Sequence, residues 1–168
     1  MDKKLIALEE YKTGNNKLLE LLNLLSDKEI EYFPGRQDAW SIKEHIIHLI
    51  DSEINGFIRL KSIIAQPSSD CYVMNEEEWT KNLRTKNEDV HKYLSVFKLI
   101  RELAYDFIIE EDPLTWNTNY FIRTYKGETI NVTIEKWLDF YNYHLKFHID
   151  FINNIYQEIN TGKKEVRE

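Results

Sequence analysis

The feature that most constrains the fold is the helical spacing of apolar side chains, which recurs in four separate segments. In each segment, apolar residues return every three or four positions with charged residues between them. This pattern is typical of a helix that buries one face and exposes the other. Four such helices in one chain predict an all-α four-helix bundle. The segments are about Asp2 to Leu25, Ile42 to about Ala65, a stretch after Asn87 that continues through Phe107, and Thr133 to Asn160.

The connection before the last segment has a different character. Pro113 ends the third periodic stretch, and the residues from Tyr120 to Val132 are rich in aromatic and β-branched side chains around Lys126 and Gly127. Such a composition predicts a short hairpin or an extended loop. A connection of about twenty residues is long for a compact bundle, and long connections often carry function.

Length and composition limit the class of protein. The 168 residues predict a single domain, 1–168, with a core of about 2–160 and a frayed tail at 161–168. The net charge of −7 disfavours nucleic acid as a partner. The chain has neither a signal peptide pattern nor a run of about 18 apolar residues, which predicts no membrane contact. Its single cysteine, Cys71, fits a reducing cytoplasm. The role of Cys71 and the oligomeric state stay open, with a homodimer as one option.

Two histidines in the last helix are the first candidates for chemistry. His144 and His148 lie one turn apart in the middle of the apolar face of that helix. Buried imidazoles need partners for their polar nitrogens. Two readings follow: core histidines bonded to backbone or tyrosine hydroxyls, or a pair of ligands for one metal ion.

The second helix begins with a recognisable cap. Ser41 and Glu44 have the spacing of a capping box, and Trp40 and His45 have that of a hydrophobic staple. These structural roles weigh against catalysis by Glu44 or His45.

The same helix is apolar around most of its circumference and has one narrow polar stripe. The stripe either faces water or lines an internal cavity, and the helical wheel does not choose between them. In the cavity interpretation, Asn55 and Arg59 should be less exposed than Glu53 or Lys61. The stripe consists of Ser41, Glu44, His45, His48, Asp51, Ser52, Asn55 and Arg59. In the third helix, Arg101 lies near the buried side and is a further candidate pocket residue, whereas His91 falls on the polar side.

Two blocks of sequence resemble those of a known family. Trp40 to Glu53 (WSIKEHIIHLIDSE) is similar to the helix-two signature of the DinB/YfiT-like family. Gly127, Thr133 and the pair His144 and His148 resemble its C-terminal block. The resemblance implies a four-helix bundle with a crossed connection and a divalent metal, often zinc or nickel, held by three histidines. Matched position by position, these ligands are His48, His144 and His148, which would make the stripe a cavity lining.

The resemblance implies three functions. The first is a metal-dependent S-transferase that joins a low-molecular-weight thiol of the bacillithiol type to electrophilic small molecules. The second is a hydrolase that uses metal-bound water, and the third is a non-catalytic metal-binding protein of the stress response.

Each enzymatic function needs its own groups. Thiol transfer favours cationic or polar side chains near the metal, and Asn55, Arg59, Arg101 and Arg123 are the candidates. Hydrolysis needs a general base, for which Glu44 or Asp51 could serve. Asp51 could equally orient a ligand ring, because it is about one turn from His48.

Overall fold

Four long helices form the body of the protein. The computed structural model describes residues 3–36, 39–83 and 87–162. The four periodic segments are all helical, and α1 ends three residues before the predicted Leu25. The predicted start at Asp2 and the tail from residue 163 onward lie outside the described residues. The long helices are α1 (Lys3–Leu22), α3 (Ile42–Ala65), α5 (Val90–Ile109) and α7 (Ile134–Asn160).

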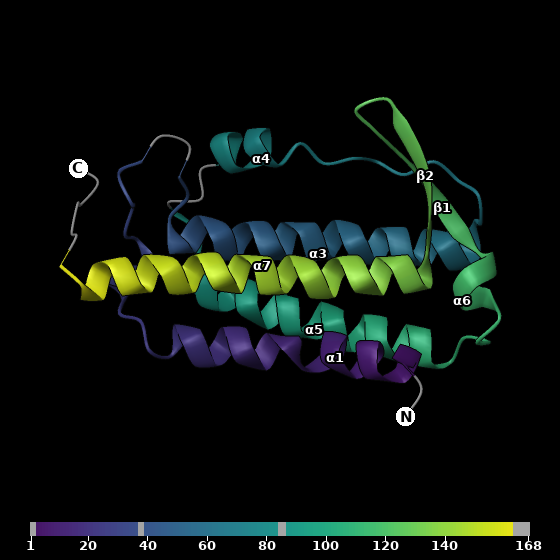
Figure 1. Ribbon diagram of the computed structural model, residues 1–168, viewed down its shortest axis with the longest axis horizontal. Helices are drawn as coiled ribbons and strands as arrows, with labels where there is room; N and C mark the ends of the chain where they lie inside the picture. The colour runs from purple at the N-terminus through teal and green to yellow at the C-terminus, as the bar shows by residue number, and fades with distance from the viewer. Residues whose placement is uncertain (1–2, 37–38, 84–86, 163–168) are drawn as a thin grey trace.

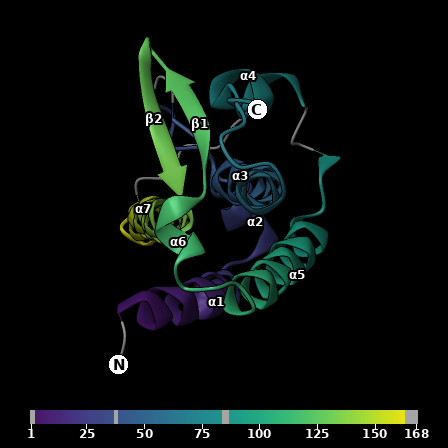
Figure 2. The same cartoon turned by 90° about the vertical axis from the view of Figure 1, so that its right-hand side faces the viewer.

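The connections between these helices cross the bundle. The helices α3 and α5 run in one direction, and α1 and α7 run in the other (Figure 1). Helix α3 packs against α7, and α5 packs against α1. Helices α3 and α5 also pack against each other. Because α3 and α5 are parallel neighbours, the chain between them must return along the whole length of the bundle. The described part of this return segment that follows α3, residues 66–83, includes the short helix α4 (Glu76–Asn82), which lies over α3 (Figure 2).

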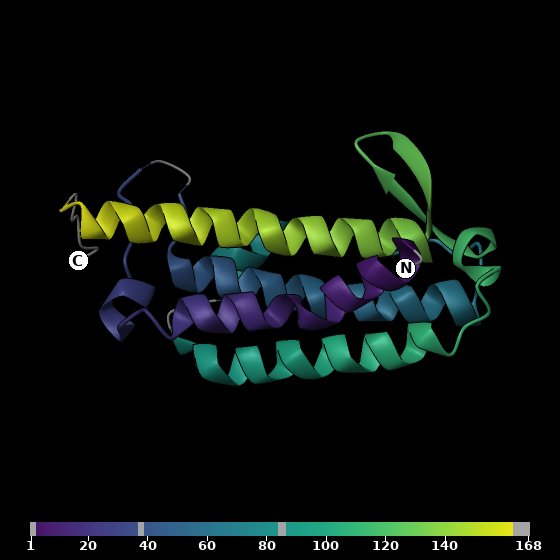
Figure 3. The same cartoon turned by 60° about the horizontal axis from the view of Figure 1, so that its bottom comes forward.

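A β-hairpin projects from one end of the bundle, next to the start of α7 (Figure 3). It consists of β1 (Tyr120–Tyr125) and β2 (Glu128–Thr133), which pair antiparallel. Lys126 and Gly127 form the turn with φ of 50° and 83°, the left-handed conformation that a two-residue hairpin turn requires. The sequence allowed a hairpin here, but its two strands make an all-α description approximate. Two further short helices complete the described elements, α2 (Asp27–Ile30) and α6 (Thr115–Thr118).

The helices α3 and α7 approach each other closely at Gly56. The indole Nε1 of Trp137 donates a hydrogen bond to the carbonyl of Gly56 at 2.9 Å. A Cβ at this position would lie 2.3 Å from the ring of Tyr141. The absence of a side chain at Gly56 therefore allows α7 to approach α3. These two helices carry the histidines described below. None of the described helices is long and apolar enough to cross a membrane.

Candidate metal centre

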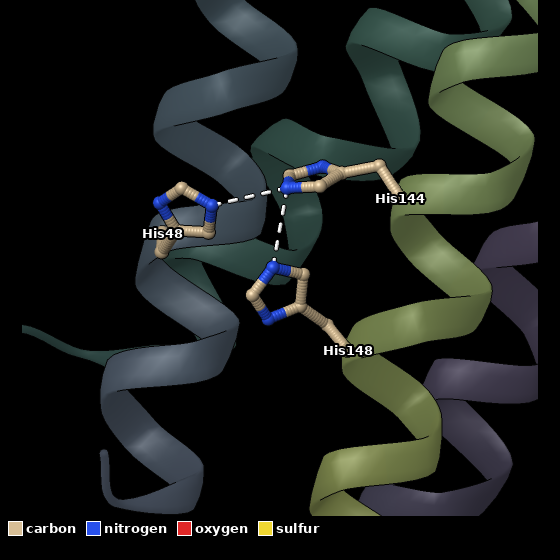
Figure 4. A group of neighbouring side chains, drawn as sticks. All are labelled: His48, His144 and His148. Atoms are coloured by element: carbon tan, nitrogen blue, oxygen red, sulfur yellow. Dashed lines mark hydrogen bonds between the residues drawn. The ribbon is translucent and has the colours of Figure 1, made fainter. Parts of the chain in front are cut away.

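Three histidines from two helices converge between α3 and α7. The Nε2 atom of His144 lies 3.1 Å from the Nε2 atom of His48 and 3.1 Å from that of His148 (Figure 4). One nitrogen from each ring can be chosen so that all three lie within 4.8 Å of one another. The helical spacing places His144 and His148 on one face of α7, and the packing of α3 against α7 brings His48 opposite them.

The predicted cap fixes the start of α3 and hence the position of His48. The Ser41 hydroxyl accepts a hydrogen bond from the Glu44 amide, and the Glu44 carboxylate accepts one from the Ser41 amide at 2.7 Å. Trp40 packs against His45, as a staple predicts, with 5.3 Å between ring centroids. It also packs edge-on against His48 at 5.0 Å. The capping sequence therefore covers one side of the triad with an indole ring.

Burial keeps these imidazoles neutral. Burial, helped by the neighbouring histidines, lowers the pKa of His48 to about 3 and that of His148 to about 2, and burial together with Arg101 lowers the pKa of His144 to about 4. Neutral imidazole nitrogens are preferred ligands for zinc, nickel and other divalent transition metals. Among the described residues, no carboxylate belongs to the same ligand group. The donor set thus fits a divalent ion held by three histidines, with coordination positions left for another molecule.

The triad borders a cavity of about 840 Å³. Its volume falls in the range of small-molecule sites. His144 and His148 reach its wall, which is otherwise largely aromatic. The wall also carries charged side chains from Arg36, α4, β1 and the end of α7. These lining residues include Trp40, His45, Phe140, Phe147, Phe151, Ile155, Arg36, Glu76, Arg123 and Glu158.

The residues of the polar stripe of α3 differ in how deeply they are buried. Its first part, including Ser41, His45 and His48, is buried, but Glu53, chosen as an exposed reference, is also buried at 1% exposure. The expected order of exposure is therefore wrong for Glu53, because that side chain enters the core. For Lys61 the order is as expected, since Lys61 is exposed while Asn55 and Arg59 are half-buried.

Three residues further along the stripe, Asp51, Asn55 and Arg59, take no part in the candidate centre. Within the described part of the chain, none of them belongs to the ligand group or lines the 840 Å³ cavity. Burial and the nearby Glu88 raise the pKa of Asp51 to about 6, which places Asp51 towards the segment that precedes α5. The return segment covers the other two: Asn55 donates to the Met74 sulfur at 3.6 Å, and Arg59 donates to the Tyr72 carbonyl at 2.8 Å. Arg59 also lines a smaller pocket of about 90 Å³, which shares Arg123 and Phe140 with the wall of the large cavity.

Arg101 lies in the core rather than in the pocket. It is fully buried, donates to the backbone carbonyl of Tyr11 at 2.7 Å, and forms an ion pair with Glu53 at 3.4 Å. Its predicted place in the substrate pocket is therefore wrong, because a side chain with no accessible surface cannot contact a substrate.

The remaining two candidates differ in their surroundings. Glu44 is engaged by the cap of α3, where its Oε2 atom accepts from both the amide and the hydroxyl of Ser41. Arg123 reaches the cavity from β1, and its guanidinium lies 5.9 Å from the centroid of the Phe140 ring. The hairpin thus brings one predicted arginine to the same cavity as the triad.

His45 is the site residue that the sequence reasoning set aside. Its Nδ1 atom lies 2.9 Å from the Nδ1 atom of His148, and its side chain also lines the cavity. The staple assignment was correct, but it hid this second contact. The sequence signal that could have identified His45 as a site residue is its spacing from His48, since the two histidines are three residues apart on one face of α3.

The comparisons with known proteins agree with this architecture. A family model described as the DinB superfamily matches residues 10–152. The chain belongs to the DinB superfamily. This confirms the resemblance that the blocks around His48 and His144 indicated.

Relatives of this DinB protein carry similar names. A protein of Bacillus subtilis, "Putative metal-dependent hydrolase YfiT", is 25% identical over 155 residues, covering 92% of this chain and 83% of the relative. A similarly named protein of Oceanobacillus iheyensis is 31% identical over 72 residues, which cover 43% of this chain and only 41% of that relative.

A solved structure shares the fold. YfiT from Bacillus subtilis, described as a probable metal-dependent hydrolase with an unusual four-helix bundle topology, superposes with a TM-score of 0.85 at 19% identity. The match covers 95% of this chain and 90% of YfiT. At this identity the likeness establishes the fold, including its crossed connections.

Proposed function

We propose that the protein is a metal-dependent S-transferase that joins a low-molecular-weight thiol to an electrophilic small molecule. The observation that carries the proposal is a triad of neutral histidines on a cavity that also holds two arginines. A divalent ion with open positions is a Lewis acid that lowers the pKa of a thiol or a water molecule bound to it. In the transfer, the thiol loses its proton, its sulfur bonds to the electrophilic carbon, and the leaving group departs with the electron pair.

The histidines would supply the metal ligands. His48, His144 and His148 present ring nitrogens from two rigid helices, and their lowered pKa values leave the lone pairs free of protons at neutral pH. Trp40 and the cavity wall exclude water from one side of the triad. Such a site favours binding of an anion such as a thiolate, because three uncharged ligands leave the ion with its full positive charge.

The arginines would bind the thiol's acidic groups. Arg123 and Arg36 both line the cavity, and guanidinium groups match the geometry of carboxylates. Arg36 already pairs with Glu158 at the rim, so a carboxylate of the thiol would compete with that side chain. The aromatic side chains, chiefly Phe147 and Phe151, would contact the organic part of the electrophile. The cavity volume leaves room for both molecules.

Hydrolysis is the second candidate, and the names of the relatives favour it. The two carboxylates predicted as bases support it less. Glu44 is held by the helix cap, and Asp51 is not among the described residues that line the cavity. A hydrolase would therefore need to use the activated water without either of them.

One set of assays separates the candidates. The protein is purified without an affinity tag, its bound metals are quantified, and 1-chloro-2,4-dinitrobenzene is offered with bacillithiol, glutathione or no thiol. Conjugation that requires both metal and thiol is expected, and Arg123→Ala should raise the KM for the thiol more than it lowers kcat. Metal-dependent cleavage of p-nitrophenyl acetate without thiol would favour the hydrolase instead. Full metal occupancy with neither activity would favour a non-catalytic metal-binding role.

A further inference from the structure

We propose that His45 is a positioning residue that holds His148 in the tautomer able to bind a metal, by accepting a hydrogen bond from the Nδ1–H group of His148. The inference rests on the proposed metal-binding role of the triad. It concerns a residue outside the three ligands and assigns it a task that its helix-capping position does not require.

The hydrogen-bond geometry of His148 carries the argument. Both of its ring nitrogens are engaged: Nε2 lies 3.1 Å from His144 inside the triad, and Nδ1 lies 2.9 Å from Nδ1 of His45. A neutral imidazole carries one proton, on one nitrogen or the other. For Nε2 to offer its lone pair to a metal, the proton must be on Nδ1. His45 must then accept that proton's hydrogen bond and carry its own proton on Nε2.

This arrangement distinguishes His148 from the other two ligands. His148 forms hydrogen bonds through both Nδ1 and Nε2. The described contacts of the His48 and His144 rings within the group are made through Nε2. Metal-binding histidines commonly direct their second nitrogen at a hydrogen-bond acceptor, which fixes the tautomer and the ring orientation. The common acceptors are carboxylates and backbone carbonyls. An imidazole acceptor does the same without adding negative charge to the site.

The ring of His45 is itself held in place. It is 7% exposed and lies between two aromatic side chains, stacked on Phe151 at 5.4 Å and tilted against Trp40 at 5.3 Å. A neutral imidazole carries one acceptor nitrogen beside its one N–H group. The packing therefore presents that acceptor to His148 before any metal arrives.

Two substitutions separate the hydrogen bond from the packing. His45→Phe keeps an aromatic ring for Trp40 and Phe151 but removes the acceptor. His45→Gln loses the ring but offers an amide oxygen that can accept from Nδ1–H. Titration of the metal-stripped proteins with Co²⁺ should show a roughly 10–100-fold weaker affinity for His45→Phe, with His45→Gln within a few-fold of the natural protein. A packing role alone predicts the reverse order and would overturn the proposal.

A second measurement does not depend on metal binding. In the metal-free protein, ¹⁵N chemical shifts of the histidine side chains report which nitrogen carries the proton. His148 should carry it on Nδ1 in the natural protein and in His45→Gln, and should shift towards the Nε2–H form in His45→Phe. A Nε2–H tautomer of His148 in the natural protein would refute the assignment. If instead Nδ1–H is found but Co²⁺ does not bind, the proposed metal function fails while the positioning contact stands.

The matched control is on the surface of the same bundle. His91 is exposed on α5 and is not among the residues of the cavity wall. His91→Phe and His91→Gln should leave Co²⁺ affinity and the His148 tautomer unchanged. An equal loss of affinity in the His91 variants would assign the effect to general destabilisation and contradict a specific role for His45.

Discussion

Two clusters of polar side chains lie inside this bundle, and both draw on α3, yet they are built in opposite ways. The first joins Tyr11, Glu53 and Arg101, and the second is the group of His48, His144 and His148 together with His45. One is closed and internally neutralised. The other borders a cavity and contains no acid.

The closed cluster connects all four long helices. Arg101 of α5 donates to the carbonyls of Tyr11 on α1 and Tyr141 on α7 and pairs with Glu53 of α3, while the Tyr11 hydroxyl also bonds to Glu53. The side chains of the ion pair are at most 2% exposed. Such a cluster has no surface to offer a ligand, so its role is to fix the packing of the helices.

The histidine cluster presents neutral ring nitrogens where the other cluster pairs opposite charges. Its rings are neutral because burial lowers their pKa values, and no acid in the described ligand group compensates a positive charge. Three of its rings, those of His45, His144 and His148, line the cavity. The difference teaches that burial alone does not identify a site: in this protein, the neutral ring nitrogens beside an opening mark the cluster suited to bind an ion.

The largest expected effect on stability is in the closed cluster. Arg101→Met should lower the free energy of unfolding by about 3–5 kcal/mol, because it leaves the Glu53 carboxylate buried without its partner. Urea denaturation followed by circular dichroism measures this change. The double variant Arg101→Met with Glu53→Met should recover much of the loss. A single variant as stable as the natural protein would show that the ion pair does not hold the helices together.

The open cluster predicts a loss of stability in acid. The folded-state pKa values of His45, His48, His144 and His148, between about 2 and 4, lie below the ordinary value of 6.5. As pH falls through 6.5, the unfolded chain therefore binds protons first, and the stability present above that pH is lost progressively. The raised pKa values of the Asp51 and Glu53 carboxyls act in the opposite sense and offset part of this loss.

Between pH 7 and 4.5 the metal-free protein should lose on the order of 2–3 kcal/mol, the equivalent of about two pKa units on one histidine. Urea denaturation across this range measures the change. Replacing His148 by Phe should flatten the profile. A stability that is constant or rises towards pH 4.5 would contradict the neutral state of the cluster.

A smaller effect is expected at the edge of the closed cluster. Tyr11→Phe removes one hydrogen bond to Glu53 but leaves the ring against Trp137, whose centroid is 5.0 Å away. The expected cost is about 1.5–3 kcal/mol, the usual range for a hydrogen bond to a charged group. Thermal denaturation should show this decrease, with metal affinity unchanged. Loss of metal affinity in this variant would mean that the two clusters are coupled.

The periodic pattern predicted the four helices because each needs to bury one apolar face, and it placed His144 and His148 on the inner face of α7. The pattern could not place Arg101 or Glu53 correctly. A charged residue at the border between the apolar and polar faces of a helix enters the core only if a partner from another helix meets it there. For the same reason the contact between His45 and His148, 103 residues apart, is not visible in local spacing. The covering of Asn55 and Arg59 depends on the path of the return segment, which turns a polar stripe into a packed surface.

The measurement that tests the central claim most directly is a Co²⁺ or Zn²⁺ titration of the metal-stripped natural protein and of His48→Ala, with His91→Ala as control. The three-histidine centre predicts one equivalent bound by the natural protein and by His91→Ala. His48→Ala should bind more than about 100-fold more weakly, because loss of a ligand should exceed the 10–100-fold cost of losing an outer partner, while its helical circular dichroism spectrum is retained. A His48→Ala protein that binds one equivalent with undiminished affinity would contradict the three-histidine centre.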